Sequence, residues 1–161
     1  DQVPDYPNVV KHCSMIENCN TEIKFDTVIM SHVLEHIEYP LPVLQKIKDW
    51  LASDGVFIIS VPNAKSIHRI VAVKMGLLKT EHTLNERDHA LGHYRVYDLE
   101  TLAAEIVEVG FKILHNGGCF LKPLSNGQIE QYWTPEMVEG FFEAGKDFPG
   151  NCAEIFVVCS H

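Results

Sequence analysis

The stretch that decides the fold is Phe25–Ile37, which reads FDTVIMSHVLEHI. Its first part, Phe25–Met30, is a short and mostly apolar run that predicts a strand. Pro40 then begins a pattern in which apolar residues recur on one helical face as far as Leu51. A nearly continuous β-branched and aromatic run follows at Val56–Val61, which is typical of a strand buried on both faces. Strand, loop, helix and strand in this order indicate an α/β domain.

The rest of the chain continues this alternation. Asp98 is a good N-cap for a helix, and Thr134-Pro135 is a typical helix start because proline suits the first turn. We therefore predict a single α/β domain over residues 1–161 with a mostly parallel sheet. The remaining predicted elements are helices near 67–71, 99–110 and 135–145, and strands near 111–114 and 153–158.

The polar stretch Lys79–Tyr94 shows no clear period, and a second segment, Lys122–Trp133, carries no recognisable motif. Structureless segments of this length are uncommon in compact domains unless they have a function. We interpret Lys79–Tyr94 as a functional loop or lid, and we expect both stretches to shape a substrate pocket.

Composition excludes several classes of protein. The formal net charge is −9, and the chain has only three arginines, so no basic surface is available to bind nucleic acid. The longest apolar runs are far shorter than a membrane span, and the first residues do not resemble a targeting segment, so we expect no membrane association and a soluble, cytoplasmic protein. The five cysteines are odd in number and scattered, which favours reduced thiols over a disulfide framework.

Several spaced motifs resemble those of class I S-adenosylmethionine-dependent methyltransferases. The similarity is greatest to the subgroup that includes the ubiquinone-biosynthesis O-methyltransferases and related small-molecule enzymes. It extends from about Val9 to Val158, and agreement of several blocks in the same order is more specific than any single motif. The matching blocks are FDTVIM at Phe25–Met30, LEHI at Leu34–Ile37, Pro40, LASDG at Leu51–Gly55, VPN at Val61–Asn63, GHYRVY at Gly92–Tyr97 and Gly110-Phe111.

This resemblance implies a Rossmann-like sheet with an antiparallel last strand, and S-adenosyl-L-methionine as the cofactor. The family's glycine-rich turn is absent, because no G-x-G follows a predicted strand and Gly117-Gly118 precedes no helix. The N-terminal strand-helix-strand unit that carries this turn is therefore missing from the chain. Either the chain is a fragment of a longer protein or it is a degenerate homologue, and the intact motifs favour a fragment.

The resemblance also implies a set of cofactor-binding residues. One group follows the strand at Phe25–Met30, where ligands collect in open α/β sheets. The other lies in Val9–Glu17, which is similar to the family's third strand and the loop after it; core packing is the alternative for Met15 and Ile16. The candidates are Ser31, His32 and Val33 in the first group, and Ser14, Met15 and Ile16 in the second.

His93 is the candidate catalytic residue, because methyl transfer to a hydroxyl requires removal of a proton near neutral pH and histidine has a suitable pKa. His36, Asn63 and Arg95 are the candidate substrate-binding residues. The alternatives are a surface position without a role for His93, helix capping for Asn63, and pairing with a nearby carboxylate for Arg95.

The segment His32–His36 also reads as H-x-x-E-H, the motif of inverted zinc peptidases. That motif requires both histidines on one long helix, whereas here it follows a strand and precedes Pro40 by only a few residues. We therefore assign no metal ion to the site, and a zinc hydrolase remains a remote alternative.

The leading hypothesis is methyl transfer from S-adenosylmethionine to an oxygen or nitrogen nucleophile of a small-molecule substrate. The alternative is a non-catalytic methyltransferase-like domain that acts as an interaction module. Since the missing unit leaves one strand edge unpaired, we also expect a homodimer through the exposed sheet edge, or an N-terminal segment that fills the gap.

Overall fold

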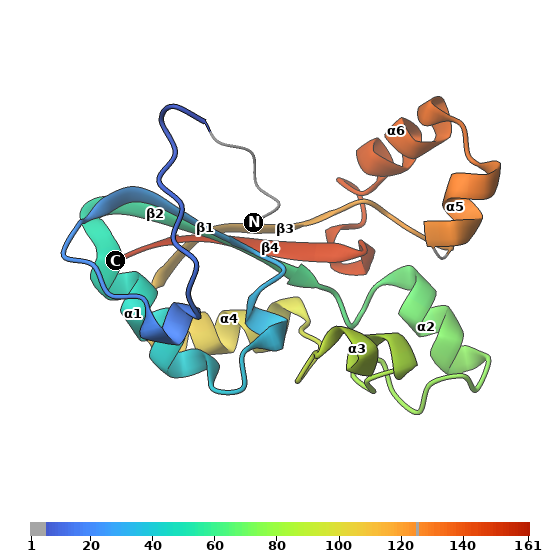
Figure 1. The fold of residues 1–161 in the computed structure, drawn as a ribbon. Coiled ribbons are helices and arrows are strands. Elements are labelled where there is room, and N and C mark those ends of the chain that lie inside the picture. Colours follow the sequence, from blue (N-terminus) through green and yellow to red (C-terminus); the bar gives the residue numbers. More distant parts are fainter. Residues whose placement is uncertain (1–5, 125) are drawn as a thin grey trace.

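The computed structural model describes residues 6–124 and 126–161, whose strands form one mixed sheet of order β1-β2-β4-β3 (Figure 1). β1 and β2 are parallel, and β4 is antiparallel to both of its neighbours, β2 and β3. This confirms the predicted α/β sheet with an antiparallel last strand. The strands are β1 (Phe25–Ser31), β2 (Leu51–Pro62), β3 (Lys112–Cys119) and β4 (Glu154–Ser160).

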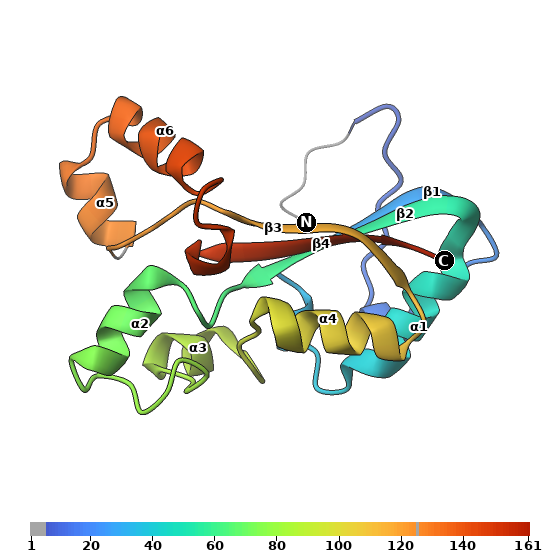
Figure 2. The ribbon, with the colours of Figure 1, turned by 180° about the vertical axis from the view of Figure 1, so that it is seen from behind.

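The α-helices occupy three places around the sheet (Figures 1 and 2). Helices α1 and α4 cover one face, α2 and α3 lie beyond the end of β2, and α5 and α6 form a hairpin at the same end of the molecule. The α-helices are α1 (Pro40–Trp50), α2 (Ile67–Lys74), α3 (Glu86–Leu91), α4 (Leu99–Glu108), α5 (Asn126–Tyr132) and α6 (Pro135–Ala144). The 3₁₀ helices are η1 (Ile16–Asn18), η2 (Leu34–His36) and η3 (Pro149–Asn151).

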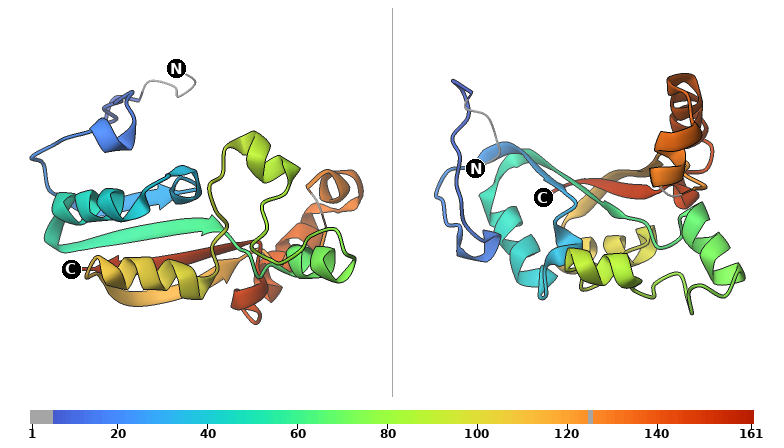
Figure 3. Two further views of the ribbon diagram at one scale, coloured as in Figure 1. Left: turned by 90° about the horizontal axis from the view of Figure 1, so that it is seen from below. Right: turned by 45° about the vertical axis from the view of Figure 1, so that its right-hand side comes forward.

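The hydrophobic core lies between the sheet and the pair α1 and α4, which run side by side in Figure 3. Alternate residues of β2 face this layer, and the ends of the helices are fixed locally. Proline occupies the first turn of α1, and Asp98 and Thr101 form a capping box at the start of α4. The buried residues of this layer include Leu44, Ile47, Phe57, Ile59, Leu102, Ile106, Ile155 and Val157.

The opposite face of the sheet is not covered by a helix within the described residues. Ile29 of β1 is 69% exposed and Leu114 of β3 is 52% exposed, although both are large and apolar. The outer edge of β1 also has no partner strand in this part of the chain. The face and the edge therefore remain available for further contacts.

The predicted strand within Val9–Glu17 is wrong. Residues 9–15 are irregular, and η1 follows at Ile16–Asn18. A strand needs a neighbour to accept its backbone hydrogen bonds, and none of the described segments pairs with these residues. This segment does not fill the free edge of β1, which leaves self-association as the untested half of that prediction.

The prediction that Lys79–Tyr94 lacks regular structure is also wrong, because α3 lies within this stretch. A helix of six residues is too short to show a hydrophobic period, but its caps are strong. Asn85 and Asp88 form a capping box, and Gly92 ends the helix with a φ of 78°, which glycine adopts without strain. Among the described residues, none of the helices is both long enough and apolar enough to span a membrane.

Candidate functional site

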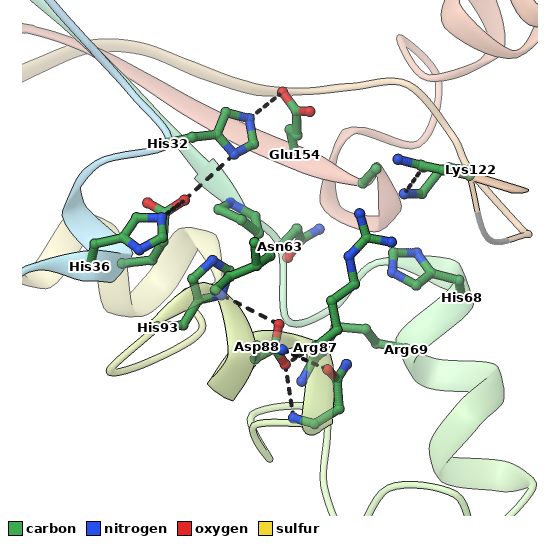
Figure 4. Close-up of a pocket in the computed structure, with 16 residues that line it drawn as sticks. His32, His36, Asn63, His68, Arg69, Arg87, Asp88, His93, Lys122 and Glu154 are labelled. Atoms are coloured by element: carbon green, nitrogen blue, oxygen red, sulfur yellow. Dashed lines mark hydrogen bonds and ion pairs between the residues drawn. The ribbon is translucent and has the colours of Figure 1, made fainter.

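A pocket of about 500 Å³ opens at the carboxyl ends of β1 and β2 (Figure 4). Ligands bind at this end of parallel strands in open α/β sheets. The walls come from η2, the segment after β2, α2, α3 and the start of β4. The two polar stretches that we expected to shape a pocket both contribute to it, with Asn85, Arg87, Asp88, Leu91 and His93 from the first and Lys122 and Asn126 from the second.

His32 is the first pocket residue after β1, and its backbone is left-handed, with a φ of 53°. This conformation is costly for a residue with a side chain, and such outliers cluster at functional sites. The ring lies between two carboxylates, with Nδ1 3.5 Å from Glu35 Oε1 and Nε2 3.2 Å from Glu154 Oε2. The sharp turn after β1 thus positions an imidazole across the mouth of the pocket.

Glu35 is the most unusual group in the pocket, because its side chain is 1% exposed and neither carboxylate oxygen has a hydrogen-bond partner. The nearby basic atoms are His32 Nδ1 at 3.5 Å and His36 Nε2 at 3.9 Å, both measured to Glu35 Oε1. Buried carboxylates normally accept several hydrogen bonds, since desolvation is otherwise expensive. Sequence analysis noted Glu35 only as part of the H-x-x-E-H segment and missed its burial.

His93 enters the pocket directly after the glycine that ends α3. Its side chain is 8% exposed, and its Nδ1 lies 3.3 Å from Asp88 Oδ1. The ring packs edge-on against His36, with ring centroids 4.6 Å apart. The backbone amide of Tyr94 donates to the carbonyl of Glu35 over 2.8 Å, which ties this segment to η2. Two distant parts of the sequence therefore meet at a pair of histidines.

Asp88 is held by a buried arginine that sequence reasoning did not select. Arg69 Nη1 lies 3.1 Å from Asp88 Oδ2, while the rest of the guanidinium donates to the carbonyls of Glu81 and Thr83. All of these contacts lie within one loop and its helix. Arg69 therefore fixes the segment that carries Asp88 and His93. Its rarity could have drawn attention to it, because the sequence has only three arginines.

The wall opposite the histidines is basic. Burial and the charge of Arg87 lower the pKa of Lys122, whose ammonium group donates to Asn126 Oδ1 over 2.9 Å. Burial and the charges of Lys122 and Arg69 lower the pKa of His68 to about 4, so this imidazole is neutral at pH 7. Lys122 and Arg87 therefore lie close enough for their charges to interact, and Glu154 is a carboxylate of the same pocket whose charge partly offsets that of Lys122.

The structure places four of the ten predicted site residues in the pocket, namely His32, His36, Asn63 and His93. Ser14 and Met15 are exposed on the N-terminal segment, and Ile16 packs against the core. Ser31 accepts a hydrogen bond from Ser60, and Val33 also packs against the core. These five do not line the pocket, and their cofactor-binding roles remain predictions.

The other two substrate-binding candidates, Asn63 and Arg95, use their side chains to hydrogen-bond the backbone of neighbouring segments. The Asn63 amide nitrogen donates to the carbonyls of Gly150 and Cys152, and its oxygen accepts from the amide of Lys65. Arg95, the tenth predicted residue, lies outside the pocket, where it donates to the carbonyls of Ile37 and Glu38 at 2.9 and 2.8 Å. Asn63 therefore ties the end of β2 to the start of β4, and Arg95 holds the loop between η2 and α1.

Comparison with known proteins agrees with this architecture. A family model described as a methyltransferase domain matches residues 3–116. No curated protein matches the chain significantly. The solved structures that resemble it include S-adenosylmethionine-dependent methyltransferases from Mesorhizobium loti (14% identity, TM-score 0.57) and Listeria monocytogenes (17% identity, TM-score 0.57). They also include the 1,6-didemethyltoxoflavin N1-methyltransferase of Burkholderia thailandensis, solved with bound 1,6-didemethyltoxoflavin and S-adenosylhomocysteine (16% identity, TM-score 0.53).

The alignments cover most of this chain but only part of each relative. They include 92%, 96% and 89% of the chain and 68%, 70% and 47% of the Mesorhizobium, Listeria and Burkholderia proteins, respectively. At these identities the structural likeness shows the fold, and the family model, which matches more than half of the chain, shows the family. The chain belongs to the S-adenosylmethionine-dependent methyltransferases.

Proposed function

We propose that this protein transfers a methyl group from S-adenosylmethionine to an oxygen or nitrogen nucleophile of a small molecule that binds in the pocket of Figure 4. The observation that carries the proposal is the His93–Asp88 pair at the carboxyl ends of two parallel strands. A carboxylate beside one ring nitrogen orients a histidine so that the other nitrogen can accept a proton.

The described residues fit only part of the cofactor. The turn at His32, directly after β1, is suited to the methionine end, but no described strand pairs with the free edge of β1. The glycine-rich turn is also absent from the sequence. We therefore propose that cofactor binding requires an additional unit that pairs with β1. The bound cofactor supplies an electrophilic methyl group on a sulfonium ion.

The residues of this chain orient the acceptor and receive its proton. With the cofactor held by the additional unit, the pocket residues would hold the acceptor hydroxyl or amine in line with the methyl group that the cofactor supplies. The acceptor proton passes to Nε2 of His93, since Nδ1 faces Asp88. The Asp88 carboxylate stabilises the imidazolium that results.

The charges of the pocket favour a particular kind of small molecule. Lys122 and Arg87 form a basic wall, whereas the whole chain has a net charge of −9. We propose that the acceptor carries a carboxylate or phosphate group that contacts these two cations.

The test is calorimetric titration of S-adenosylhomocysteine into this chain and into a form extended upstream of Asp1. We expect binding by the extended form and little or none by the chain alone. In methyl-transfer assays of the extended form, His93→Gln lowers kcat by about 100-fold or more, whereas His89→Gln on the exposed side of α3 has no effect. Absence of cofactor binding by both forms would instead indicate a non-catalytic interaction module.

A further inference from the structure

Three potential metal ligands meet at the inner end of the pocket. One carboxylate oxygen of Glu35 and one ring nitrogen each of His36 and His93 all lie within 4.8 Å of one another. Figure 4 shows His36 and His93 pointing into the same space from separate segments. A bound ion with ligand bonds near 2.1 Å would place these atoms about 3 to 4 Å apart, so the cluster needs to contract by about 1 Å. His36, whose side chain is 38% exposed, has room to make this adjustment.

The burial of Glu35 points independently to a cation. Its side chain is 99% buried, both oxygens lack hydrogen-bond donors, and no lysine or arginine pairs with it among the described residues. An uncompensated buried carboxylate costs several kcal/mol in general, and native proteins retain one where a proton or an ion satisfies it. A metal ion would satisfy this carboxylate, and the neighbouring imidazoles are groups that can bind the same ion.

Two further contacts resemble the outer shell of a metal site. Asp88 Oδ1 lies 3.3 Å from His93 Nδ1 without forming a hydrogen bond, so the carboxylate faces this side of the ring and leaves Nε2 available as the ligand nitrogen. Such carboxylate–histidine pairs orient ligands in many metal sites. On the other side, His32 Nδ1 lies 3.5 Å from Glu35 Oε1 and limits how the carboxylate can rotate.

We propose that Glu35, His36 and His93 bind one divalent transition-metal ion. Two imidazoles and one carboxylate suit Zn²⁺, Co²⁺, Fe²⁺ or Mn²⁺ better than Mg²⁺ or Ca²⁺, which prefer oxygen ligands. Three protein ligands leave positions open toward the pocket for water or for an acceptor oxygen. This site differs from that of an H-x-x-E-H hydrolase, because η2 is a short 3₁₀ helix and the second histidine ligand is His93 rather than His32.

Metal binding would change the role of His93 within the proposed function. With an ion bound, Nε2 of His93 would be a ligand rather than a base, and the ion would supply Lewis acidity toward an acceptor oxygen in the pocket. The binding proposal itself does not rest on methyl transfer, because all three ligands lie in the chain described above. Metal affinity and methyl transfer can therefore succeed or fail separately.

The test is titration of metal-free protein with Co²⁺ and Zn²⁺, followed by visible absorption and calorimetry. We expect one saturable site whose Co²⁺ spectrum shows nitrogen and oxygen ligands without thiolate bands. Glu35→Gln and His36→Gln should each weaken binding by about 100-fold, since even outer-shell changes cost roughly 10- to 100-fold. The matched control, His89→Gln, removes an exposed histidine outside the cluster and should leave affinity unchanged.

Thermal unfolding of the metal-free variants separates a lost ligand from a lost fold. Glu35→Gln retains the shape of the side chain and removes a buried charge, so its melting temperature should equal or exceed that of the unmodified chain. Two results would overturn the proposal. One is the absence of saturable binding by the unmodified chain, and the other is one-to-one binding that folded Glu35→Gln and His36→Gln variants retain.

Discussion

The two faces of the sheet are built from the same strands but differ in what covers them. On the face toward α1 and α4, residues such as Phe57 and Ile59 are fully buried. On the opposite face, Ile29, Ile58 and Val158 lie in one row across β1, β2 and β4, and Ile29 is 69% exposed. The difference teaches that residue type and alternation set which side chains share a face, whereas the helices that pack on that face decide whether it is a core.

The largest difference between the faces should appear in stability. Phe57→Ala removes a fully buried ring and leaves a cavity, so the free energy of unfolding should fall by about 3–5 kcal/mol. Ile29→Ala, on the same sheet but the open face, should change it by less than about 0.5 kcal/mol. Urea denaturation of dilute, monomeric protein, followed by circular dichroism, measures both. Equal losses for the two variants would mean that the open face is covered in solution.

A smaller loss of stability is expected when the N-cap of α4 is changed. This cap begins the helix that packs on the covered face of the sheet. Burial alone would raise the pKa of Asp98, but hydrogen bonds from Thr101 and Lys65 outweigh burial and lower it to about 2. Because this value is below the ordinary value of 3.8, the stabilisation is fully present above pH 4 and is lost as the pH falls toward 2. Asp98→Asn should therefore cost about 2 kcal/mol at pH 7.

The pH dependence of unfolding checks this assignment. The difference in stability between the unmodified chain and Asp98→Asn should shrink between pH 4 and pH 2. Glu100→Gln is a matched control, because Glu100 also lies near Lys65 but its side chain is 87% exposed. If Glu100→Gln cost as much as Asp98→Asn, the surface charge rather than the buried cap would account for the effect.

Substitutions on the open face should change the free energy of unfolding least. Their effect should appear instead in how strongly the chains associate. We predict that the chain self-associates through the free edge of β1 and the apolar row beside it. Replacing Ile29 and Leu114 with threonine should reduce the association measured by sedimentation and change the free energy of unfolding by less than about 0.5 kcal/mol. A monomeric unmodified chain at high concentration would be evidence against this prediction.

Local patterns predicted the sheet and its helices well where they were strong. The proline at the start of α1, the N-cap Asp98 of α4 and the apolar runs of β1 and β2 all correspond to observed elements. Two predictions failed, one because a helix was missed and one because a strand was assigned where none forms. The six-residue α3 was missed because it is too short for a period, although Asn85 and Asp88 mark its cap. The apolar segment at 9–17 was assigned a strand that lacks a partner to pair with.

The candidate site was less predictable than the fold. His36 and His93 were selected, but as a substrate ligand and a base, and their proximity to each other was not foreseen. Arg95 and Asn63 were expected to bind substrate, whereas their hydrogen bonds to backbone carbonyls hold loops in place. A side chain's type shows which partners it can bind, but only the folded chain shows which partners it reaches.

The sequence by itself determined the alternation of strands and helices, the helix caps and the family, because each depends on residues close together in the chain. Only the tertiary structure decided which face of the sheet is buried and which side chains meet in the pocket. The buried, unpaired Glu35 beside His36 and His93 is the clearest case. Its environment depends on how η2 packs against the segment after α3, and contacts between distant segments leave no local pattern in the sequence.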